Sequence, residues 1–302
     1  MKPIVIAAVA TFAAVLIQPA GAQSQGRLAL IRSTGTITIG FPESSVPFAY
    51  LDGRQKPVGY TVEISVKAVA EMKTALGPSK LEIKFNPTTS ATRIPSMANG
   101  TIDLECGNTT NNVERQKLIS FAPTTFVAQV VLMARKDANV DPNDPASFRG
   151  KTVAGQAGGQ SFKIFSKLNA DGNFGMDIVQ AKDQDEIFLM VETGRAAGAV
   201  DGGLAYGQVA ASRNHEAYVV GTPGHELATY GIMQPKDDPE FKAAVDAAVL
   251  KLIKDGTVTS LYDKYFNAPI PPRGINLKYP MSDALKRALA KPTDSGDPAD
   301  YQ

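Results

Sequence analysis

The sequence is poor in the residues that most often carry metal or covalent chemistry. Its 302 residues include one cysteine, two histidines and no tryptophan. Cys106 stands alone, which excludes an intramolecular disulfide, and its alternating context "IDLECG" is more typical of a small buried apolar side chain than of a nucleophile. Neither His215 nor His225 belongs to a Cys/His or Asp/Glu set with metal-ligand spacing. We therefore expect no metal, no cofactor and no catalytic residue.

An excess of charge of one sign is also absent. The chain has 31 Lys and Arg against 30 Asp and Glu, which gives a formal net charge of +1. No global field therefore favours nucleic acid or an acidic membrane. Runs of like charge and a basic stripe interleaved with aromatic residues are missing as well, so we do not expect the protein to bind nucleic acid.

Long apolar runs are confined to the first residues. Lys2 precedes an apolar stretch at 4–17, and small residues follow it at Ala20 and Ala22. This arrangement is typical of a secretory signal peptide, and the stretch is shorter than the roughly 20 apolar residues that span a bilayer. We expect residues 1–22 to be removed on export to the periplasm. No cysteine follows Ala22, so lipid attachment at that site is not indicated.

What the sequence does contain is an alternation of strand and helix patterns, which predicts an α/β fold. The units are short, as in βαβ repeats with a mostly parallel sheet. The first series has expected strands at 35–41, 81–85 and 101–107 and expected helices at 59–77 and 89–100. The second series has expected strands at 151–155 and 215–221, a helix at 161–168, and a helix, turn and strand within 186–203. Two more helices are expected within 236–266.

Two segments connect the series, 124–136 and 225–237. Two connections imply that a second lobe is inserted into the first, with a cleft between lobes that are hinged by two strands. The expected boundaries are 27–128 and 226–290 for the first lobe and 129–225 for the second. Residues 291–302 are rich in proline and aspartate and are expected to form a loose tail.

The polar stretch "ECGNTTNNVERQK" at 105–117 is the most informative for function. Asn111 and Glu114 have the spacing of a capping box, which predicts that a helix begins there. Unpaired amide groups and the helix dipole at its start, hydroxyls of Thr109 and Thr110, and the planar fork of Arg115 together form an anion site. The alternative is a well-capped helix in which Arg115 pairs with Glu114 or another neighbour.

Several stretches in a fixed order resemble one family. They are "GFPESSVPFAY", "VGYTVEI", "TSATRIPSMANGTIDLECGNTTNNVERQK", "FRGKTVA", "ETGRAAGAVDGG", "KDDPEF" and "LYDKYFNAPIPPRG", from about 35 to about 274. The chain is similar to the periplasmic solute-binding proteins of polar amino-acid ABC transporters (family 3), in particular the glutamate/aspartate-binding branch. The resemblance implies a two-lobed type II binding protein that closes over an amino acid, delivers it to an inner-membrane ABC permease and acts as a monomer.

The resemblance also implies the residues that hold the ends of the ligand. Arg115 would bind the α-carboxylate, and Thr110 would add a hydroxyl. Backbone amides of the opposite lobe's Gly-rich turn, from Gly158 to Ser161 and including Gly159 and Gln160, would close over it. Asp201 would accept the ammonium group. An amino-acid zwitterion needs one fixed cation and one fixed anion shielded from water, which agrees with this set, although an aspartate before a glycine pair is also typical of a simple turn.

Other residues implied by the resemblance face the ligand side chain. Ser90 and Arg93 would contact it, although Arg93 could equally be a cation on a helix surface. The glutamate/aspartate binders carry an arginine where this chain has Pro42, a histidine near Gln184, and a serine at Asn108. Loss of a buried cation should weaken selection for a second carboxylate by ~2–5 kcal/mol if nothing compensates. The expected ligand is therefore glutamate or aspartate, or a neutral polar amino acid such as glutamine or asparagine.

Two rival functions remain open on the sequence. Some secreted dehydratases that act on cyclic amino-acid precursors resemble solute-binding proteins, and in such an enzyme Glu43 or Asp201 would be a general acid or base. No nucleophile–base pair supports this alternative. The other rival is a sensory binding module that serves a separate receptor protein.

Overall fold

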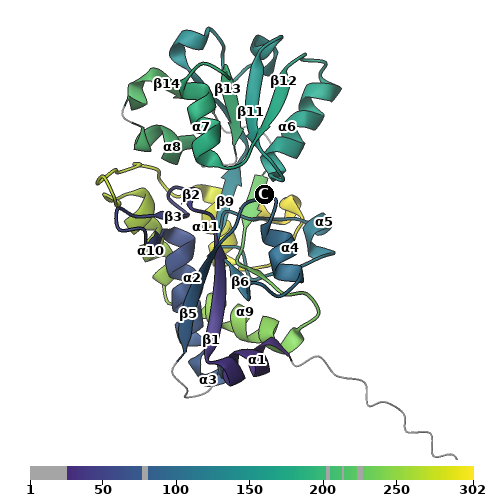
Figure 1. Ribbon diagram of the computed structural model, residues 1–302, viewed down its shortest axis with the longest axis vertical. Coiled ribbons are helices and arrows are strands. Elements are labelled where there is room, and N and C mark those ends of the chain that lie inside the picture. Colours follow the sequence, from purple (N-terminus) through teal and green to yellow (C-terminus); the bar gives the residue numbers. More distant parts are fainter. Residues whose placement is uncertain (1–25, 77–80, 202–204, 213, 223–226) are drawn as a thin grey trace, which may run out of the picture.

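The computed structural model describes residues 26–76, 81–201, 205–212, 214–222 and 227–302. The expected signal peptide at 1–22 and His225 lie outside these residues. The chain forms two α/β lobes joined by a narrow waist, with the middle of the sequence in one lobe and both ends of the described residues in the other (Figure 1). Within the described residues, no helix is long and apolar enough to span a bilayer.

Lobe 1 is built on a five-stranded sheet. Its strands are, in spatial order, β5 (Glu82–Pro87), β1 (Thr36–Phe41), β6 (Leu104–Glu105), β16 (Met233–Gln234) and β8 (Ser120–Phe121). The helices of this lobe are α1 (Arg27–Thr34), α2 (Tyr60–Glu71), α3 (Lys73–Leu76), α4 (Arg93–Ala98), α5 (Val113–Gln116), α9 (Pro239–Lys254), α10 (Thr257–Phe266) and α11 (Asp283–Ala290). A small antiparallel sheet adds β2 (Ser44–Ser45), β3 (Ala49–Leu51) and β4 (Pro57–Val58).

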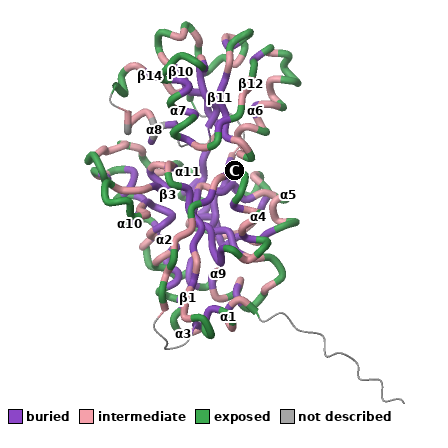
Figure 2. The backbone as a smooth tube through the Cα atoms, in the orientation of Figure 1, coloured by how far each residue is buried: buried purple, intermediate pink, exposed green. Residues whose placement is uncertain are grey.

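Lobe 2 repeats the same plan. Its sheet has the order β12 (Asp177–Ala181), β11 (Thr152–Gln156), β13 (Gly198–Asp201), β10 (Val131–Arg135) and β14 (Tyr218–Val220). The helices are α6 (Gln160–Asp171), α7 (Gln184–Glu192) and α8 (Ala205–Ala211), with short 3-10 turns η1 (Lys136–Ala138), η2 (Pro145–Phe148) and η3 (His215–Ala217). Buried residues follow the sheets of both lobes and continue through the waist (Figure 2).

Each sheet contains one strand that runs against the other four. In lobe 1 the reversed strand is β16, which pairs antiparallel with both β6 and β8. In lobe 2 it is β10, which pairs antiparallel with β13 and β14. Each reversed strand directly follows a crossing strand, since β9 (Phe126–Gln129) leads into β10 and β15 (Leu227–Tyr230) leads into β16. The expected mostly parallel sheets and two crossings are therefore confirmed, and the chain's change of lobe explains the exceptions.

The two crossing strands lie side by side and are anchored in lobe 1. They pair antiparallel, with Phe126 opposite Tyr230, and β7 (Thr110–Asn111) pairs along the other edge of β15. The rings of Phe126 and Tyr230 stack at 5.7 Å, and Phe48 packs edge-on against both. The Tyr60 hydroxyl donates to the carbonyl oxygen of Thr125 at 2.7 Å, just before β9. Offset and edge-to-face aromatic contacts favour one geometry, so this cluster holds the crossings firmly at the lobe 1 side.

Local sequence signals explain several helix ends. Asp238 caps α9 by accepting a hydrogen bond from the amide of Phe241 at 3.0 Å, and Pro239 is the first helical residue, as expected. Gly256 separates α9 from α10 with a φ of 80°, a conformation that glycine adopts without strain. Cys106 is fully buried in the core of lobe 1, which confirms its interpretation as a small apolar side chain.

The last residues do not form the expected loose tail. They end in a 3-10 turn, η4 (Pro298–Tyr301), and the Tyr301 side chain is 2% exposed. Its hydroxyl shares a hydrogen bond of 2.9 Å with the Thr124 hydroxyl, next to the first crossing. The proline and aspartate content misled the prediction because these residues here cap and begin a tight turn, Asp297 accepting from the amide of Ala299.

Candidate functional site

A small cavity of about 30 Å³ lies between the two lobes and brings the predicted residues together. All nine line it, namely Ser90, Arg93, Asn108, Thr110, Arg115, Gly159, Gln160, Gln184 and Asp201. Five further residues complete the lining, namely Gln156, Ser161, Phe162, Val200 and Tyr230. Lobe 1, lobe 2 and the crossing strand β15 all contribute, so the cavity exists in this form only while the lobes are together.

Arg115 projects from the short helix α5 to the boundary between lobes. One guanidinium nitrogen donates to the carbonyl oxygen of Thr110 at 2.8 Å, and the other donates to that of Gly158 in lobe 2 at 3.2 Å. Burial, and then the nearby charge of Arg93, lower the pKa of Arg115 to about 10, so it stays charged at neutral pH. Two guanidinium groups that repel each other beside a cavity are suited to an anion. An anion would offset both the repulsion between the two charges and the loss of water around Arg115.

Arg93 is an interior residue, not a surface cation. Its side chain is 2% exposed and forms an ion pair at 3.5 Å with Glu105, which is 0% exposed. Arg93 also donates to the hydroxyl of Ser90 at 2.5 Å and to that of Thr109, while Thr109 donates to Glu105 at 2.5 Å. A buried charge needs such partners. The hydroxyl of Thr109, expected at the mouth of the site, therefore points inward and completes the ion pair.

The Gly-rich turn of lobe 2 approaches lobe 1 too closely for any side chain. Gly158 has a φ of 72°, and a Cβ there would lie 3.0 Å from the Cα of Ala91 and 3.0 Å from the carbonyl oxygen of Ser90. Helix α6 begins immediately afterwards at Gln160, whose side-chain oxygen accepts a hydrogen bond from Asn112 of lobe 1 at 3.1 Å. Glycine thus permits both the turn and the contact between lobes.

Asp201 ends strand β13 and is 5% exposed. The Asp201 charge acts on Tyr230 of the second crossing strand. Burial is the main cause that raises the pKa of the Tyr230 hydroxyl, and the negative charge of Asp201 raises it further. A hydrogen bond from Asn108 lowers the same pKa. The carboxylate therefore lies near the crossing strand, and Asp201 lines the same cavity as the lobe 1 arginines. Arg115 and Asp201 share one cavity, as the expectation of a zwitterion site requires.

Gln156 and Gln184 form an amide pair on the lobe 2 side of the cavity. The side-chain nitrogen of Gln184 donates to the side-chain oxygen of Gln156 at 3.2 Å, and both residues are buried. Sequence reasoning missed Gln156, although its place at the end of an alternating strand just before the Gly-rich turn was a usable signal. It also missed Phe162, Val200 and Tyr230, which carry no local signal because apolar and aromatic residues at such positions are typical of a core.

The start of α5 differs from the expectation. Asn112, not Asn111, is the cap, and its side-chain oxygen accepts a hydrogen bond from the amide of Arg115 at 2.8 Å. Asn111 instead belongs to strand β7, and Glu114 pairs with Lys117 at 2.7 Å rather than with Arg115. The helix has only four residues, so its dipole is slight. The start of α5 therefore adds little to an anion site here, which would depend on side chains and on the opposite turn, where the longer helix α6 begins.

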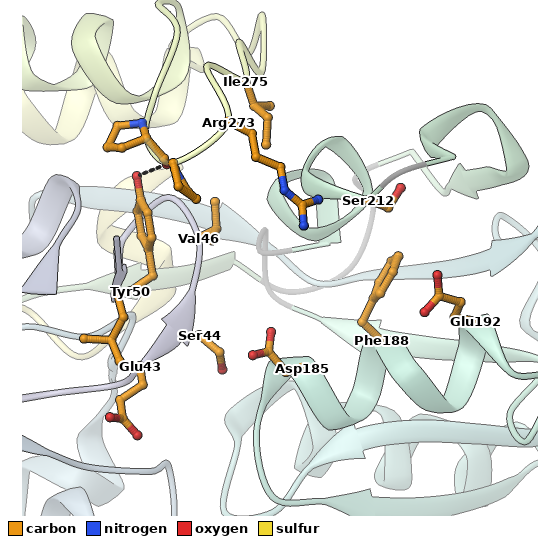
Figure 3. Close-up of a pocket in the computed structure, with 13 residues that line it drawn as sticks. Glu43, Ser44, Val46, Tyr50, Asp185, Phe188, Glu192, Ser212, Arg273 and Ile275 are labelled. Atoms are coloured by element: carbon orange, nitrogen blue, oxygen red, sulfur yellow. Dashed lines mark hydrogen bonds between the residues drawn. The ribbon is translucent and has the colours of Figure 1, made fainter. Parts of the chain in front are cut away.

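A larger groove of about 430 Å³ lies along the same boundary between lobes (Figure 3). Glu43, Tyr50 and Arg273 line it from lobe 1, and Asp185 and Phe188 from α7 of lobe 2. None of the nine predicted residues lines this groove. Glu43 is exposed there, while Asp201 lines the other cavity, so the two candidates for an acid or base in the dehydratase alternative lie at different places. The described residues contain no group of three or more His, Cys, Asp or Glu side chains arranged to hold a metal.

Comparison with known proteins adds independent observations. The chain is 42% identical over 288 residues to the L-glutamate/L-aspartate-binding protein of Pseudomonas aeruginosa, covering 94% of this chain and 95% of that protein. It is 39% identical over 266 residues to the glutamate/aspartate import solute-binding protein of Escherichia coli K12, with 87% of each covered. Among solved structures, a mutant of ArgBP from T. maritima matches with a TM-score of 0.70 and 27% identity, over 80% of this chain and 99% of that one.

The family comparison covers most of both lobes. Residues 37–268 match the bacterial extracellular solute-binding proteins, family 3. This range includes both sheets except Thr36, both crossings and every residue that lines the cavity between lobes. The chain therefore belongs to the family 3 bacterial extracellular solute-binding proteins.

Proposed function

We propose that this protein binds a free amino acid in the cavity between its lobes and delivers it to an ABC permease in the inner membrane. The observation that carries the proposal is that Arg115 of lobe 1 and Asp201 of lobe 2 line one cavity between the lobes. A cation and an anion on opposite sides of one cavity match the two ends of a zwitterion. The relatives named as glutamate/aspartate-binding proteins support the same class of ligand.

In the proposed complex, Arg115 binds the α-carboxylate with its guanidinium fork, and the Thr110 hydroxyl and the amides of the turn at 159–160 complete the contact. The Asp201 carboxylate accepts the α-ammonium group. Closure of lobe 2 over lobe 1 excludes water and strengthens both charged contacts. These roles are the ones that the resemblance implies, and the placement of the residues around the cavity supports them.

We propose L-glutamate and L-aspartate as the first ligands to consider, because Arg93 offers a buried cation beside Ser90 and because of the named relatives. A specific observation also favours the neutral amides glutamine and asparagine. Glu105 already lies 3.5 Å from Arg93, so the formal charges of these two residues and of Arg115 and Asp201 cancel. Pro42 offers no charge beside this ion pair, and Gln156 and Gln184 present amide groups.

A calorimetric titration of the secreted protein with glutamate, aspartate, glutamine and asparagine tests the function and separates the two candidates. We expect saturable binding of one ligand per chain, with one pair preferred, and a rise in melting temperature in a thermal-shift screen of the twenty amino acids. Failure of every amino acid to bind or to stabilise the protein would contradict the proposal.

We infer that the cavity binds its ligand without chemical turnover and that the protein acts as a periplasmic monomer. The names of the relatives describe binding and import. Incubation with prephenate or arogenate should leave both unchanged, whereas formation of a dehydrated product would support the enzyme alternative. Loss of amino-acid uptake in cells that lack the protein would separate delivery to a permease from service to a receptor.

A further inference from the structure

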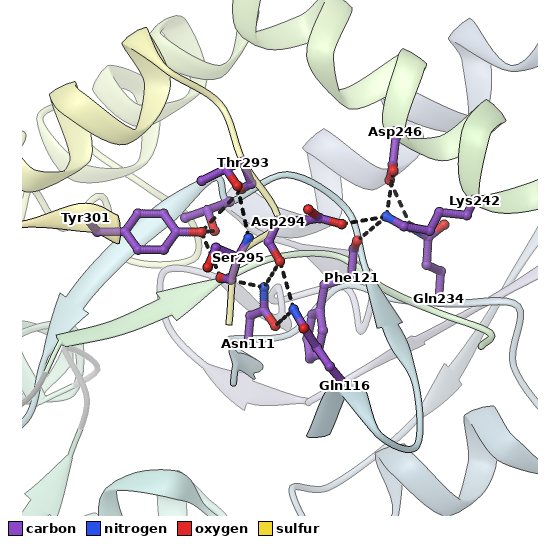
Figure 4. Close-up of polar contacts among 11 residues, drawn as sticks. Asn111, Gln116, Phe121, Gln234, Lys242, Asp246, Thr293, Asp294, Ser295 and Tyr301 are labelled. Carbon is purple, nitrogen blue, oxygen red and sulfur yellow. Dashed lines mark hydrogen bonds and ion pairs between the residues drawn. The ribbon is translucent and has the colours of Figure 1, made fainter. Parts of the chain in front are cut away.

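The C-terminal segment 291–302 contacts the polar stretch that carries Arg115, the start of the first crossing and the second crossing strand. Helix α11 precedes it and packs against the first crossing strand β9, while η4 packs against α11 and the second crossing strand β15. Figure 4 shows its residues in one network with Asn111 and Gln116 of lobe 1. None of residues 291–302 lines the cavity itself, and all of them lie outside the range that matches the family.

The segment binds the polar stretch that carries Arg115. The side-chain nitrogen of Asn111 donates to the carbonyl oxygens of Asp294 at 2.9 Å and Ser295 at 3.1 Å. The side-chain nitrogen of Gln116 donates to the same Asp294 carbonyl at 2.8 Å and to the side-chain oxygen of Asn111 at 2.8 Å. Asn111 precedes α5 and Gln116 is its last residue, so the C-terminal segment holds both ends of the structure that presents Arg115.

Gly296 brings the segment against the first turn of α5. A Cβ at this position would lie 2.7 Å from the amide nitrogen of Val113 and 2.8 Å from the carbonyl carbon of Asn112. Contacts this short do not occur, and backbone atoms cannot rotate away as the end of a side chain can. Any side chain at Gly296 would therefore displace either the segment or the start of α5.

The segment also fixes the point where the chain enters the first crossing. Besides its bond to Thr124, the Tyr301 hydroxyl donates to the carbonyl oxygen of Ser295 at 2.9 Å, and the amide of Thr124 donates to the carbonyl oxygen of Thr293 at 2.9 Å. Lys242 of α9 bridges Asp294 at 2.7 Å and Asp246 at 2.6 Å, and donates to the carbonyl oxygen of Phe121 at 2.9 Å (Figure 4). The segment is thus tied to α9, to β8 and to the entry of β9.

We propose that the C-terminal segment positions the α-carboxylate site and the hinge, so that it sets ligand affinity without touching the ligand. Its residues act through Arg115, which they hold by way of Asn111, Gln116 and the start of α5. This inference rests on the proposed function, because it assigns the segment to the same amino-acid site. Disturbing the segment should weaken binding by about 2- to 30-fold, the range found for mutations that alter a site through intermediate residues.

The primary test compares two glycine-to-alanine variants of the full chain. Gly296→Ala introduces the clash with α5, whereas Gly53→Ala adds a Cβ with a nearest neighbour 3.7 Å away and serves as the matched control. Calorimetry should show a higher Kd for Gly296→Ala and an unchanged Kd for Gly53→Ala. Tyr301→Phe is the second variant, since it removes only a hydroxyl and decides the question if Gly296→Ala does not fold.

Two further measurements separate positioning from a merely structural role. In the background of Arg115→Lys, Gly296→Ala should weaken binding less than it does in the wild type, because both changes act through the same contact. By reciprocity, ligand binding should slow hydrogen exchange at the amides of Ser295, Asp297 and Ala299. A lower melting temperature with a Kd within twofold of the wild type for both Gly296→Ala and Tyr301→Phe would overturn the inference. A wild-type protein that binds no amino acid in the same titrations would instead overturn the proposed function.

Discussion

The guanidinium of Arg115 in lobe 1 donates a hydrogen bond of 3.2 Å to the carbonyl oxygen of Gly158 in lobe 2. The residue proposed to meet the ligand thus also forms one of the bonds that join the lobes. A second bond between lobes, from Asn112 to Gln160 at 3.1 Å, lies on the same two segments. Contact with ligand and closure of the cleft are therefore properties of one small region, which explains how binding on one lobe can favour the closed arrangement.

Replacement of Arg115 by alanine should abolish most of the binding energy. The ligand carboxylate would be buried without its cation, so we expect a loss of about 3–5 kcal/mol in binding free energy. Isothermal titration calorimetry measures this loss. Glu114→Ala is the matched control, since Glu114 is exposed on the same helix and pairs with Lys117. Near-normal affinity of Arg115→Ala would contradict the assignment of the carboxylate site.

Asp201→Asn should weaken binding by about 2–5 kcal/mol, because a buried ammonium group would lose its charged partner. The sharper measurement uses a ligand analogue in which a keto group replaces the amino group. The analogue should bind the wild type weakly, and Asp201→Asn should not weaken it further. An equal loss for the amino acid and the analogue would place the effect of Asp201 on structure rather than on the ammonium.

Gly158→Ala should block closure of the lobes. The added Cβ would meet the backbone of Ala91 and Ser90 at 3.0 Å, and alanine would also be strained at a φ of 72°. Small-angle scattering should show no ligand-induced decrease in the radius of gyration. Gly194→Ala is the control because Gly194 has a similar φ of 73° and a Cβ there would have no atom within 4 Å, so it shares the strain without the clash. Loss of closure in both variants would argue against a steric cause.

Gln184→His should shift the preference toward acidic ligands as the pH falls. Histidine gains its proton below about pH 6.5, and a cation beside the ligand side chain favours a carboxylate by about 1.5 kcal/mol or more when the pair is close. The ratio of glutamate to glutamine affinity should therefore rise between about pH 7.5 and about pH 5.5 in this variant, by comparison with Gln184→Asn. A ratio that does not change with pH would show that residue 184 does not face the ligand side chain.

Asp103 should leave a signature in the pH dependence of stability. Burial raises the pKa of its carboxyl above the ordinary value of 3.8, although the amide of Thr38 and the charge of Arg27 at 3.1 Å act in the opposite direction. The folded protein then binds more protons than the unfolded chain just above pH 3.8, so stability falls as pH rises through this window. Denaturant titrations should show this fall for the wild type relative to Asp103→Asn, and parallel profiles would contradict it.

Much of the local structure follows from the sequence. Strand β1 and the cap of α9 at Asp238 carry their signals in neighbouring residues, so periodicity and capping chemistry were sufficient. The two crossings could be anticipated because one connecting segment precedes the second α/β series, at 124–136, and another follows it, at 225–237. The residues around the cavity came from the resemblance to a family rather than from local chemistry, and their roles as ligand contacts stay predictions.

The exact residue at which a helix begins was less well predicted where two similar residues are adjacent. The choice between Asn111 and Asn112 as the cap depends on strand β15, which pairs with Asn111 and takes it out of the helix. The sequence pattern favoured Asn111, because Glu114 lies three residues after it. A distant partner in the chain decided between them, since Thr229 lies opposite Asn111.

Sequence patterns were sufficient to predict the class of the fold and its two lobes, and the resemblance to a family pointed to a cation and an anion suited to a zwitterion. The folded arrangement was needed to show that Glu105 neutralises Arg93, that Gln156 joins Gln184, and that the C-terminal segment packs against the stretch that carries Arg115. The difference lies in the distance along the chain between the interacting residues. Helices, turns and caps depend on residues within a few positions, whereas the burial and pairing of polar groups depend on segments that meet only when the chain has folded.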